Sequence, residues 1–422
     1  MRISVLALSF LSIGVVTEPV GAQCVDRPVR TAEYRNGVWY DGSGFRAATF
    51  YGNRGLLTRT RPATVDTVID LAGGYVIPPL GEAHNHNFGH STDGPEEAIA
   101  AYQKDGVFYV AILSSFPRFT APVLPKLNCN TSVDVIFAHG GITGRGGHPV
   151  RLREQLLGYG LYPGYTKETL ENHAYFIVDS LPDIDRKLPL LLADKPDIVK
   201  ILMLYSEEYE KRKNDTTYFG RKGLNPELVP VLVERAHKEG LRVFAHVQTA
   251  HDFRVAVEAG VDVIAHLPGY RGRLEPIDSA VAVAAARKGI AITPTASLAV
   301  RGTSGDSVKL DTAAYQRTRA GQITNLRLLR SAGVNVIVGS DVYNDTSRGE
   351  VDYLRELGIY SNAELLRMWA VDTPRAIFPK RRIGLLDDDH EASFLVLDGN
   401  PLEDWNAMRR IKLRVKQGQI IP

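Results

Sequence analysis

Three histidines and one glutamate stand within ten residues in the stretch GEAHNHNFGH, positions 81 to 90. The whole chain has only 11 histidines among its 422 residues, so this stretch holds a large share of them. His84 and His86 are two residues apart and follow an apolar run. Side chains two apart on an extended segment point the same way, so both imidazoles can bind one cation. The stretch therefore predicts a metal site where a strand ends.

Polar side chains also lie in later apolar runs: Lys200 in DIVKILM, His246 in RVFAHV, His266 in VDVIAHL and Asp341 in NVIVGSDV. Lys200 is the most informative of them, because an ammonium inside an apolar strand is costly and burial beside a cation depresses its pKa. A neutral lysine amine can take up carbon dioxide, and the two oxygens of the resulting carbamate can bridge two metal ions. The alternative is an ordinary lysine whose ammonium reaches solvent.

Eight β-branched runs alternate with longer amphipathic stretches that end in glycine. The runs are 75–80, 106–113, 133–142, 196–203, 242–247, 261–267, 290–297 and 335–342. This alternation is typical of a parallel (β/α)8 TIM barrel, in which the carboxyl ends of the strands form the rim that holds the active site. A doubly wound open sheet is the alternative, but no GxGxxG motif follows the first run.

The flanking residues have a different pattern. Residues 29–74 and 391–422 carry short alternating runs separated by Gly, Asn and Asp. Two β-rich chain ends outside a barrel most simply pair with each other. We therefore predict an α/β protein with a barrel over residues 75–385 and a small β-sandwich domain built from residues 23–74 and 386–422.

The first 22 residues are typical of a secretory signal peptide: a basic start, a short apolar stretch and a small-residue end at Ala22. They predict a secreted or periplasmic protein. Lipid attachment at Cys24 is the alternative, which Gln23 directly before it disfavours. Cys24 and Cys129 either pair or remain free thiols. No later run approaches about 18 apolar residues, which argues against a membrane span, and a formal charge of +2 argues against a nucleic-acid partner.

Together these motifs resemble the amidohydrolase superfamily, in its binuclear prolidase-like and imidazolonepropionase-like branch. The resemblance rests on AHNH, DIVKI, VGSD and the long block LVERAHKEGLRVFAHVQTAHDFRVAVEAGVDVIAHL. It implies two divalent metal ions held by these ligands: His84, His86, Lys200, His246, His266 and Asp341. In such enzymes the first two histidines and the aspartate bind the more buried metal ion, and the next two histidines bind the second metal ion. The carboxylated lysine bridges the two ions. The family usually has aspartate where this chain has Glu82, for which we expect a supporting role behind the metal ligands.

The resemblance implies hydrolysis of an amide or peptide bond by a metal-bridging hydroxide, with Asp341 passing the proton to the leaving amine. Histidine and carboxylate ligands favour Zn²⁺, with manganese or cobalt as alternatives. We expect a small-molecule or short-peptide substrate, a carboxylate-bearing N-acyl amino acid or dipeptide; a lactonase or cyclic-amide hydrolase is the alternative. A deaminase would have a general-acid glutamate at the position of Thr249. A secreted protein with a closed structural zinc site is the non-enzyme alternative, although it would not need Lys200. The sequence is compatible with a monomer and with a homo-oligomer.

Candidate substrate contacts lie on loops after the apolar runs. The glycine-rich segment 139–149, HGGITGRGGHP, could close over the site. Its His139 is the second candidate for catalytic proton transfer after Asp341. The candidate substrate-binding residues are His148, Arg145, Tyr205, Tyr270 and Arg271. An arginine there could bind a substrate carboxylate, and a solvated loop cation is the alternative. The other histidines are interpreted as surface or packing residues: His90, His173, His237, His251 and His390.

Overall fold

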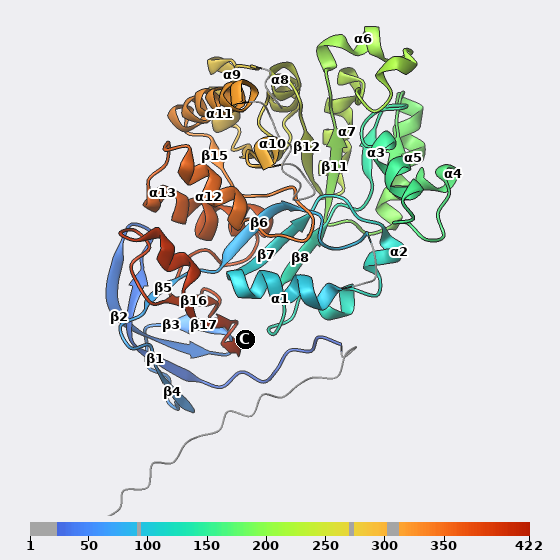
Figure 1. Cartoon of the computed structure of the whole chain (residues 1–422). Coiled ribbons are helices and arrows are strands. Elements are labelled where there is room, and N and C mark those ends of the chain that lie inside the picture. The colour runs from blue at the N-terminus through green and yellow to red at the C-terminus, as the bar shows by residue number, and fades with distance from the viewer. Residues whose placement is uncertain (1–22, 91–93, 270–273, 302–311) are drawn as a thin grey trace, which may run out of the picture.

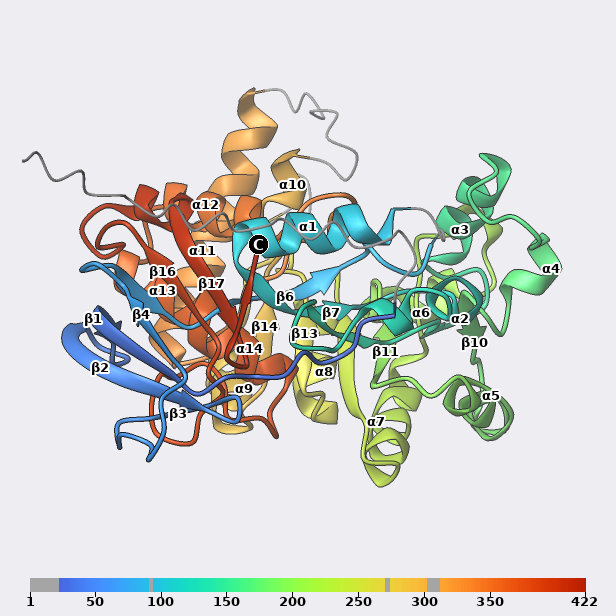
Figure 2. The same ribbon diagram turned by 90° about the horizontal axis from the view of Figure 1, so that it is seen from below.

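The computed structural model describes residues 23–90, 94–269, 274–301 and 312–422. The expected signal peptide and two candidate substrate contacts, Tyr270 and Arg271, lie outside these ranges. The described chain is a mixed α/β structure in which helices cover parallel strands and a further sheet lies to one side (Figures 1 and 2). Among the described residues, no helix has the length and apolar character needed to cross a bilayer.

Two parallel sheets occupy the centre of the molecule. Their strand orders are β6-β7-β8 and β10-β9-β11-β12-β13-β14-β15. The bounds are β6 Leu80–Asn85, β7 Val107–Ile112, β8 Asp134–Phe137, β9 Gly141–Thr143, β10 Tyr175–Ile177, β11 Ile198–Leu202, β12 Arg242–His246, β13 Val263–Ala265, β14 Ala291–Thr293 and β15 Asn335–Val336. Every residue of β6, β7, β8 and β11 is buried, as expected for parallel strands covered on both faces.

Backbone hydrogen bonds connect the two parallel sheets at two places. The N–H of Asp197, directly before β11, donates to the carbonyl of Phe137 in β8 over 2.8 Å. On the other side, the N–H of Ala83 in β6 donates to the carbonyl of Val338 beyond β15 over 2.9 Å. The carboxyl ends of β6 and β15 therefore lie next to each other, which brings the histidine stretch beside Asp341.

Helices follow most of the parallel strands. Their bounds are α1 Pro95–Asp105, α2 Pro117–Thr120, α3 Val150–Gly158, α4 Lys167–Leu170, α5 Leu181–Ala193, α6 Tyr209–Arg212, α7 Val229–Lys238, α8 Ala250–Ala259, α9 Ser279–Arg287, α10 Leu298–Arg301, α11 Thr312–Ala332, α12 Arg348–Glu356, α13 Asn362–Arg367 and α14 Thr373–Ile377. Single 3-10 turns lie at Leu124–Lys126, Ser206–Glu208, Thr216–Tyr218, Pro226–Leu228 and Trp405–Arg409, and a π-helical turn at Met368–Asp372. Helix α7 buries Val229, Leu232, Val233 and Ala236, the spacing of one helical face.

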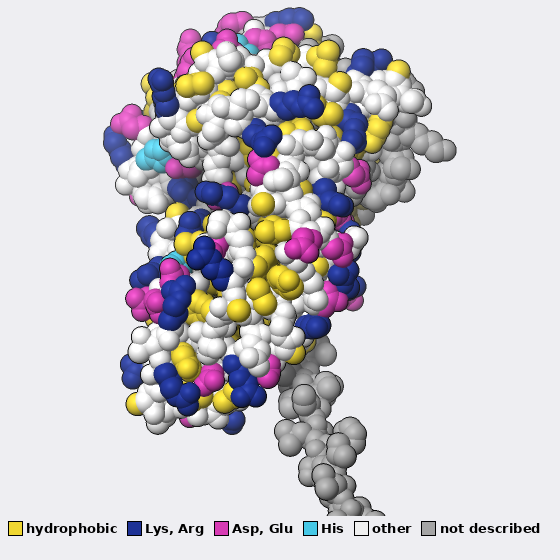
Figure 3. All heavy atoms as spheres, turned by 90° about the vertical axis from the view of Figure 1, so that its left-hand side faces the viewer, with side chains coloured by type: hydrophobic (Ala, Val, Ile, Leu, Met, Phe, Trp, Pro, Cys, Tyr) yellow, Lys and Arg dark blue, Asp and Glu magenta, His cyan; other side chains and the backbone are white. Residues whose placement is uncertain are grey.

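Both chain ends build the third sheet. Its order is β18-β17-β16-β5-β1-β2-β3, with β4 paired to β1. The bounds are β1 Ala32–Tyr40, β2 Phe45–Asn53, β3 Leu56–Thr58, β4 Thr67–Asp70, β5 Tyr75–Ile77, β16 Phe394–Leu397, β17 Ile411–Lys416 and β18 Gln419–Ile421. Strand β5 pairs with β1 on one side and with β16 on the other. On the face shown in Figure 3, which includes this sheet, basic and acidic side chains are interspersed.

The expected first barrel strand, residues 75–80, is divided between two sheets. Tyr75–Ile77 belongs to the sheet of the chain ends, whereas the first parallel strand begins at Leu80. Pro78 and Pro79 separate the two strands. Proline has no backbone N–H and cannot donate to a strand ladder, so the two prolines end one pairing before the next begins.

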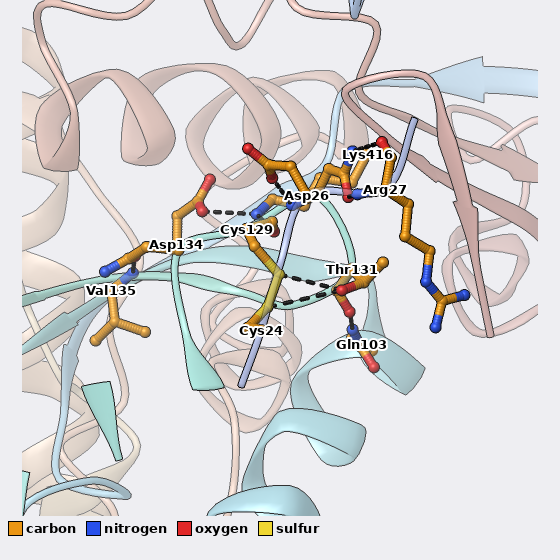
Figure 4. Close-up of a disulfide and its surroundings, with 11 residues drawn as sticks. Cys24, Asp26, Arg27, Gln103, Cys129, Thr131, Asp134, Val135 and Lys416 are labelled. Carbon is orange, nitrogen blue, oxygen red and sulfur yellow. Dashed lines mark hydrogen bonds and ion pairs between the residues drawn. A yellow bond between two sulfur atoms is a disulfide. The ribbon is translucent and has the colours of Figure 1, made fainter. Parts of the chain in front are cut away.

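A disulfide joins Cys24 to Cys129, with the two Cα atoms 5.9 Å apart (Figure 4). It attaches the first described residues to the segment that precedes β8. Asn130 strengthens this attachment, because its N–H donates to the Asp26 carboxylate over 2.8 Å and its side chain donates to the carbonyl of Arg27 over 2.9 Å. Of the two alternatives, a disulfide or two free thiols, the structure has the disulfide.

Candidate metal centre

Three of the expected ligands meet at one point. His84 lies in β6, His86 directly beyond it, and Asp341 after β15. The Nε2 atoms of His84 and His86 lie 3.2 and 2.8 Å from the same oxygen, Oδ1 of Asp341. The ligand atoms of all three residues lie within 4.8 Å of one another. Two imidazole nitrogens and a carboxylate at this spacing form a candidate site for a divalent cation.

The backbone holds Asp341 against the histidine strand. The N–H groups of Ser340 and Asp341 both donate to the carbonyl of His84, over 3.1 and 2.7 Å. Gly339 permits this approach, because a Cβ there would lie 2.7 Å from the His84 nitrogen. Asp341 and His266 have φ angles of 55° and 78°, in the left-handed region that non-glycine residues rarely adopt. Such backbone is concentrated at functional sites.

Glu82 lies behind these ligands and is fully buried. Its carboxylate accepts from the N–H groups of His84 and Ser340, over 3.1 and 2.9 Å, and from the Ser340 hydroxyl over 2.7 Å. Burial raises the pKa of Glu82 to about 8, although these donors act in the opposite direction. Through these hydrogen bonds the Glu82 side chain links the strand of His84 to the segment that carries Asp341, which is a supporting position rather than a ligand position.

The remaining expected ligands line the same cavity: Lys200, His246 and His266. The rings of His246 and His266 have centroids 4.3 Å apart, and His266 lies 4.9 Å from His84 by the same measure. The Nδ1 atom of His266 lies 2.7 Å from the Thr295 hydroxyl. Lys200 Nζ and His246 Nε2 are buried without a hydrogen-bond partner. Buried polar atoms without partners are costly, so these two atoms point to a bound group.

The electrostatic environment favours the protonation states that bind metals. Burial lowers the pKa of His84 to about 4 and that of Lys200 to about 7, and lowers the pKa values of His246 and His266 well below the usual range. Burial alone would raise the pKa of Asp341, but the adjacent His84 and His86 outweigh it and hold that pKa well below its usual value. Neutral imidazoles, a neutral amine and a carboxylate are the forms that metal binding and carbamate formation require.

The cavity has a volume of about 250 Å³, and most of its wall is apolar. His148 lines it, with its ring centroid 5.1 Å from that of His246. Three other expected contacts are not among the described residues of the wall. His139 is buried, with Nδ1 3.0 Å from the Ser115 hydroxyl; the exposed Arg145 pairs with Asp179; and the ring of Tyr205 lies 3.7 Å from the Arg212 guanidinium.

Two residues that the sequence did not single out line the cavity. Arg153 lies on the buried face of α3 and is 2% exposed. Tyr343, two residues after Asp341, stacks on His86 with ring centroids 5.2 Å apart. His90 connects them, since its Nδ1 lies 3.4 Å from Arg153 and its ring 5.5 Å from Tyr343. Arg153 had one sequence signal: it follows Val150 by three residues and precedes Leu157 by four, so it shares their apolar helix face.

Comparisons with known proteins agree with this architecture. No family model matches the sequence. The ochratoxinase of Aspergillus niger is 22% identical over 241 residues, which are 56% of this chain and 48% of that enzyme. The match thus spans about half the length of the curated relative.

Solved structures match over almost the whole chain. The crystal structure of A. niger ochratoxinase covers 93% of this chain and 96% of its own, with a TM-score of 0.70 and 17% identity. An amidohydrolase structure covers 92% and 98%, with a TM-score of 0.69 and 19% identity. This chain has the amidohydrolase fold. A Xaa-Pro dipeptidase with methionine in its active site matches with a TM-score of 0.69 at 17% identity, covering 92% of this chain and 99% of its own. The amidohydrolase fold is the one that the sequence motifs predicted.

Proposed function

We propose that this protein is a metal-dependent hydrolase that cleaves an amide or peptide bond in a carboxylate-bearing N-acyl amino acid or dipeptide. The observation that carries the proposal is the buried Lys200, whose amine has no hydrogen-bond partner and lines one cavity with five histidines and Asp341. A structural zinc site has no use for such a lysine. The shared fold with proteins named ochratoxinase and Xaa-Pro dipeptidase supports a hydrolase that acts on carbon-nitrogen bonds.

We infer that the two parallel sheets form a single closed (β/α)8 barrel. The hydrogen bonds from Asp197 to Phe137 and from Ala83 to Val338 connect the two sheets at two places and so support closure. The sheet of the chain ends would be the main layer of the β-sandwich domain, with the boundary at Pro78 and Pro79 instead of residue 75. In this arrangement the candidate ligands lie at the carboxyl ends of the strands, where barrel enzymes have their active sites.

The residues present fit two divalent metal ions. His84, His86 and Asp341 would hold one ion, His246 and His266 the other, and Lys200 as a carbamate would bridge them. Nitrogen and carboxylate ligands suit Zn²⁺. When bound, such ions lower the pKa of a water molecule and polarise the substrate carbonyl.

The chain's own residues would move the proton and shape the site. Asp341, held as a carboxylate by its two histidine neighbours, accepts a proton from the attacking water and donates it to the leaving amine. Glu82 keeps Asp341 and His84 in register. The apolar wall excludes water and binds an apolar side chain of the substrate.

The alternative activities have less support. The position of a deaminase's glutamate is held by Thr249, which begins α8 as its N-cap and is hydrogen-bonded to the N–H of Asp252. That side chain stabilises a helix end and is not available as a general acid. A lactone or cyclic amide would meet the same polarised carbonyl site, so this alternative depends on the activity test. The disulfide supports the proposal of a secreted or periplasmic protein, because such bonds persist in oxidising compartments.

The deciding experiment combines elemental analysis with a substrate panel. Purified protein should contain about two divalent metals per chain, and chelation followed by Zn²⁺ addition should restore turnover. The panel consists of N-acyl amino acids, dipeptides, lactones and aminated heterocycles. Faster ring opening of a lactone, or release of ammonia from a heterocycle at a higher rate than any amide is cleaved, would replace the proposed activity with that one.

A further inference from the structure

Arg153 carries a positive charge in the cavity wall, and no carboxylate of the described residues pairs with it. Its guanidinium donates to the Tyr162 hydroxyl over 2.7 Å, to the Ser114 hydroxyl, and toward His90 Nδ1 over 3.4 Å. These partners are neutral. Among the described residues, no carboxylate forms an ion pair with it, and its Nε is buried without a hydrogen-bond partner. A buried cation without an anion is costly, so its position is explained by an anion that binds in the cavity.

The rest of the wall agrees with an anionic ligand. Apart from Lys200, which the proposed function converts to a carbamate, Arg153 is the only lysine or arginine among the described residues that line the cavity, and the acidic Asp341 lies against His84 and His86.

Arg153 lies close to the candidate metal ligands. It contacts His90, whose ring centroid is 5.9 Å from that of His86. The imidazole ring of His90 therefore lies between the Arg153 guanidinium and the metal ligand His86. In an N-acyl amino acid or a dipeptide, only a few covalent bonds separate the carbonyl of the scissile amide from the terminal carboxylate. A carboxylate bound to Arg153 would thus leave that carbonyl beside the metal ligands.

Resting on the function proposed above, we propose that Arg153 binds the carboxylate of the substrate and so selects acids over their neutral amides. Guanidinium groups recognise carboxylates through two parallel N–H donors, which is more specific than a single charge. Leu113, Leu152 and Leu204 in the same wall suit an apolar residue next to that carboxylate. The exposed Arg145, expected from the sequence to bind this group, is paired with Asp179 outside the cavity.

The test compares two ligands and three variants. N-acetyl-L-phenylalanine and its primary amide differ only in the terminal group, which is a carboxylate in one and a neutral amide in the other. Calorimetry in an Asp341→Asn background, which should keep the metal but turn over slowly, gives the Kd of each. The variants are Arg153→Leu, Arg153→Lys and, as the matched control, Arg151→Leu. Arg151 stands two residues away on the same helix and is exposed. Acetate release from both ligands supplies kcat and KM separately.

With Arg153 intact, the metal-loaded protein should bind the acid at least about tenfold more tightly than the amide. Arg153→Leu should weaken binding of the acid by about 10- to 100-fold and leave the amide within about threefold. The Kd of Arg153→Lys for the acid should lie between those of the wild type and Arg153→Leu, because an ammonium keeps the charge but not the paired donors. Arg151→Leu should bind both ligands with the same Kd values as the protein with wild-type Arg151. The effect on acetate release should fall mainly on KM for the acid.

Equal affinity for acid and amide with Arg153 intact would overturn the proposal, and so would a preference for the acid that survives in Arg153→Leu. If that variant does not fold, as circular dichroism will show, Arg153→Lys and the comparison of the two ligands with Arg153 intact still decide. The binding result is separate from the proposed activity. A protein that prefers the acid through Arg153 but releases no acetate would keep this inference and refute the hydrolysis of this substrate class.

Discussion

Replacement of Lys200 by methionine should stabilise the metal-free protein while removing its bridging group. Lys200 is 4% exposed in the apolar strand β11. Burial lowers its pKa from 10.5 to about 7, against a smaller opposite effect of Asp341. Between these values the unfolded chain binds the proton that the folded chain releases, so folding becomes more favourable as pH rises. Burial of the Lys200 ammonium therefore lowers the free energy of unfolding by its full amount, about 5 kcal/mol, below pH 7. About 4 kcal/mol of this destabilisation remains at about pH 7.5.

Urea unfolding of chelator-treated protein measures this difference. Lys200→Met should have the higher free energy of unfolding, with an advantage that shrinks as the pH is raised toward 10.5. The metal-loaded variant should contain less metal by elemental analysis and should lose turnover. Ile201→Met is the control, since this neighbour is equally buried and the exchange should cost less than about 1.5 kcal/mol without changing metal content. A Lys200→Met protein that is no more stable than wild type, or that keeps full metal content and activity, would refute the reasoning.

Three further variants test other parts of the structure. Asp341→Asn should keep most of the metal but lose on the order of 10² to 10⁴ in turnover, because an amide cannot accept the proton; near-normal kcat would move the proton transfer to another group. The double variant Cys24→Ser with Cys129→Ser opens a link across 105 residues, which should lower the free energy of unfolding by about 2 to 5 kcal/mol in urea; an unchanged midpoint would contradict this. Glu82→Ala leaves the N–H groups of His84 and Ser340 without their acceptor, so unfolding free energy should fall by about 2 to 4 kcal/mol and metal affinity by about 10- to 100-fold. Metal titration checks this, and wild-type affinity would exclude a supporting role for Glu82.

The sequence predicted the six candidate ligands because each lies in or directly after an apolar run. A parallel strand arrangement turns such one-dimensional positions into neighbours, so His84 and Asp341 meet although 257 positions separate them. The limits of the first strand were less predictable. The run through residue 80 reads as one apolar segment, and only the pairing partners reveal that Pro78 and Pro79 divide it.

The wall of the cavity was harder to predict than the ligands. Arg145 and Arg153 lie eight positions apart in the sequence, and residue type alone favours the arginine on the glycine-rich loop. Their surroundings differ in the folded chain, because α3 turns Arg153 inward while Arg145 faces solvent beside Asp179. Such a difference depends on the rotation of a helix against a sheet, which local patterns specify weakly.

The pairing of the two chain ends affects how the protein can fold during its synthesis. Strand β5 is covered on one side by β1 and on the other by β16, which begins more than 300 residues later at Phe394. Until the ribosome has released that segment, β5 has an open edge with unpaired backbone groups, and such edges recruit strands of other chains. The helices and parallel strands can form earlier, from contacts that are closer in sequence. A polypeptide that terminates before residue 394 would therefore still contain the strands and helices around the candidate metal ligands. It would nevertheless aggregate through the exposed edge of β5.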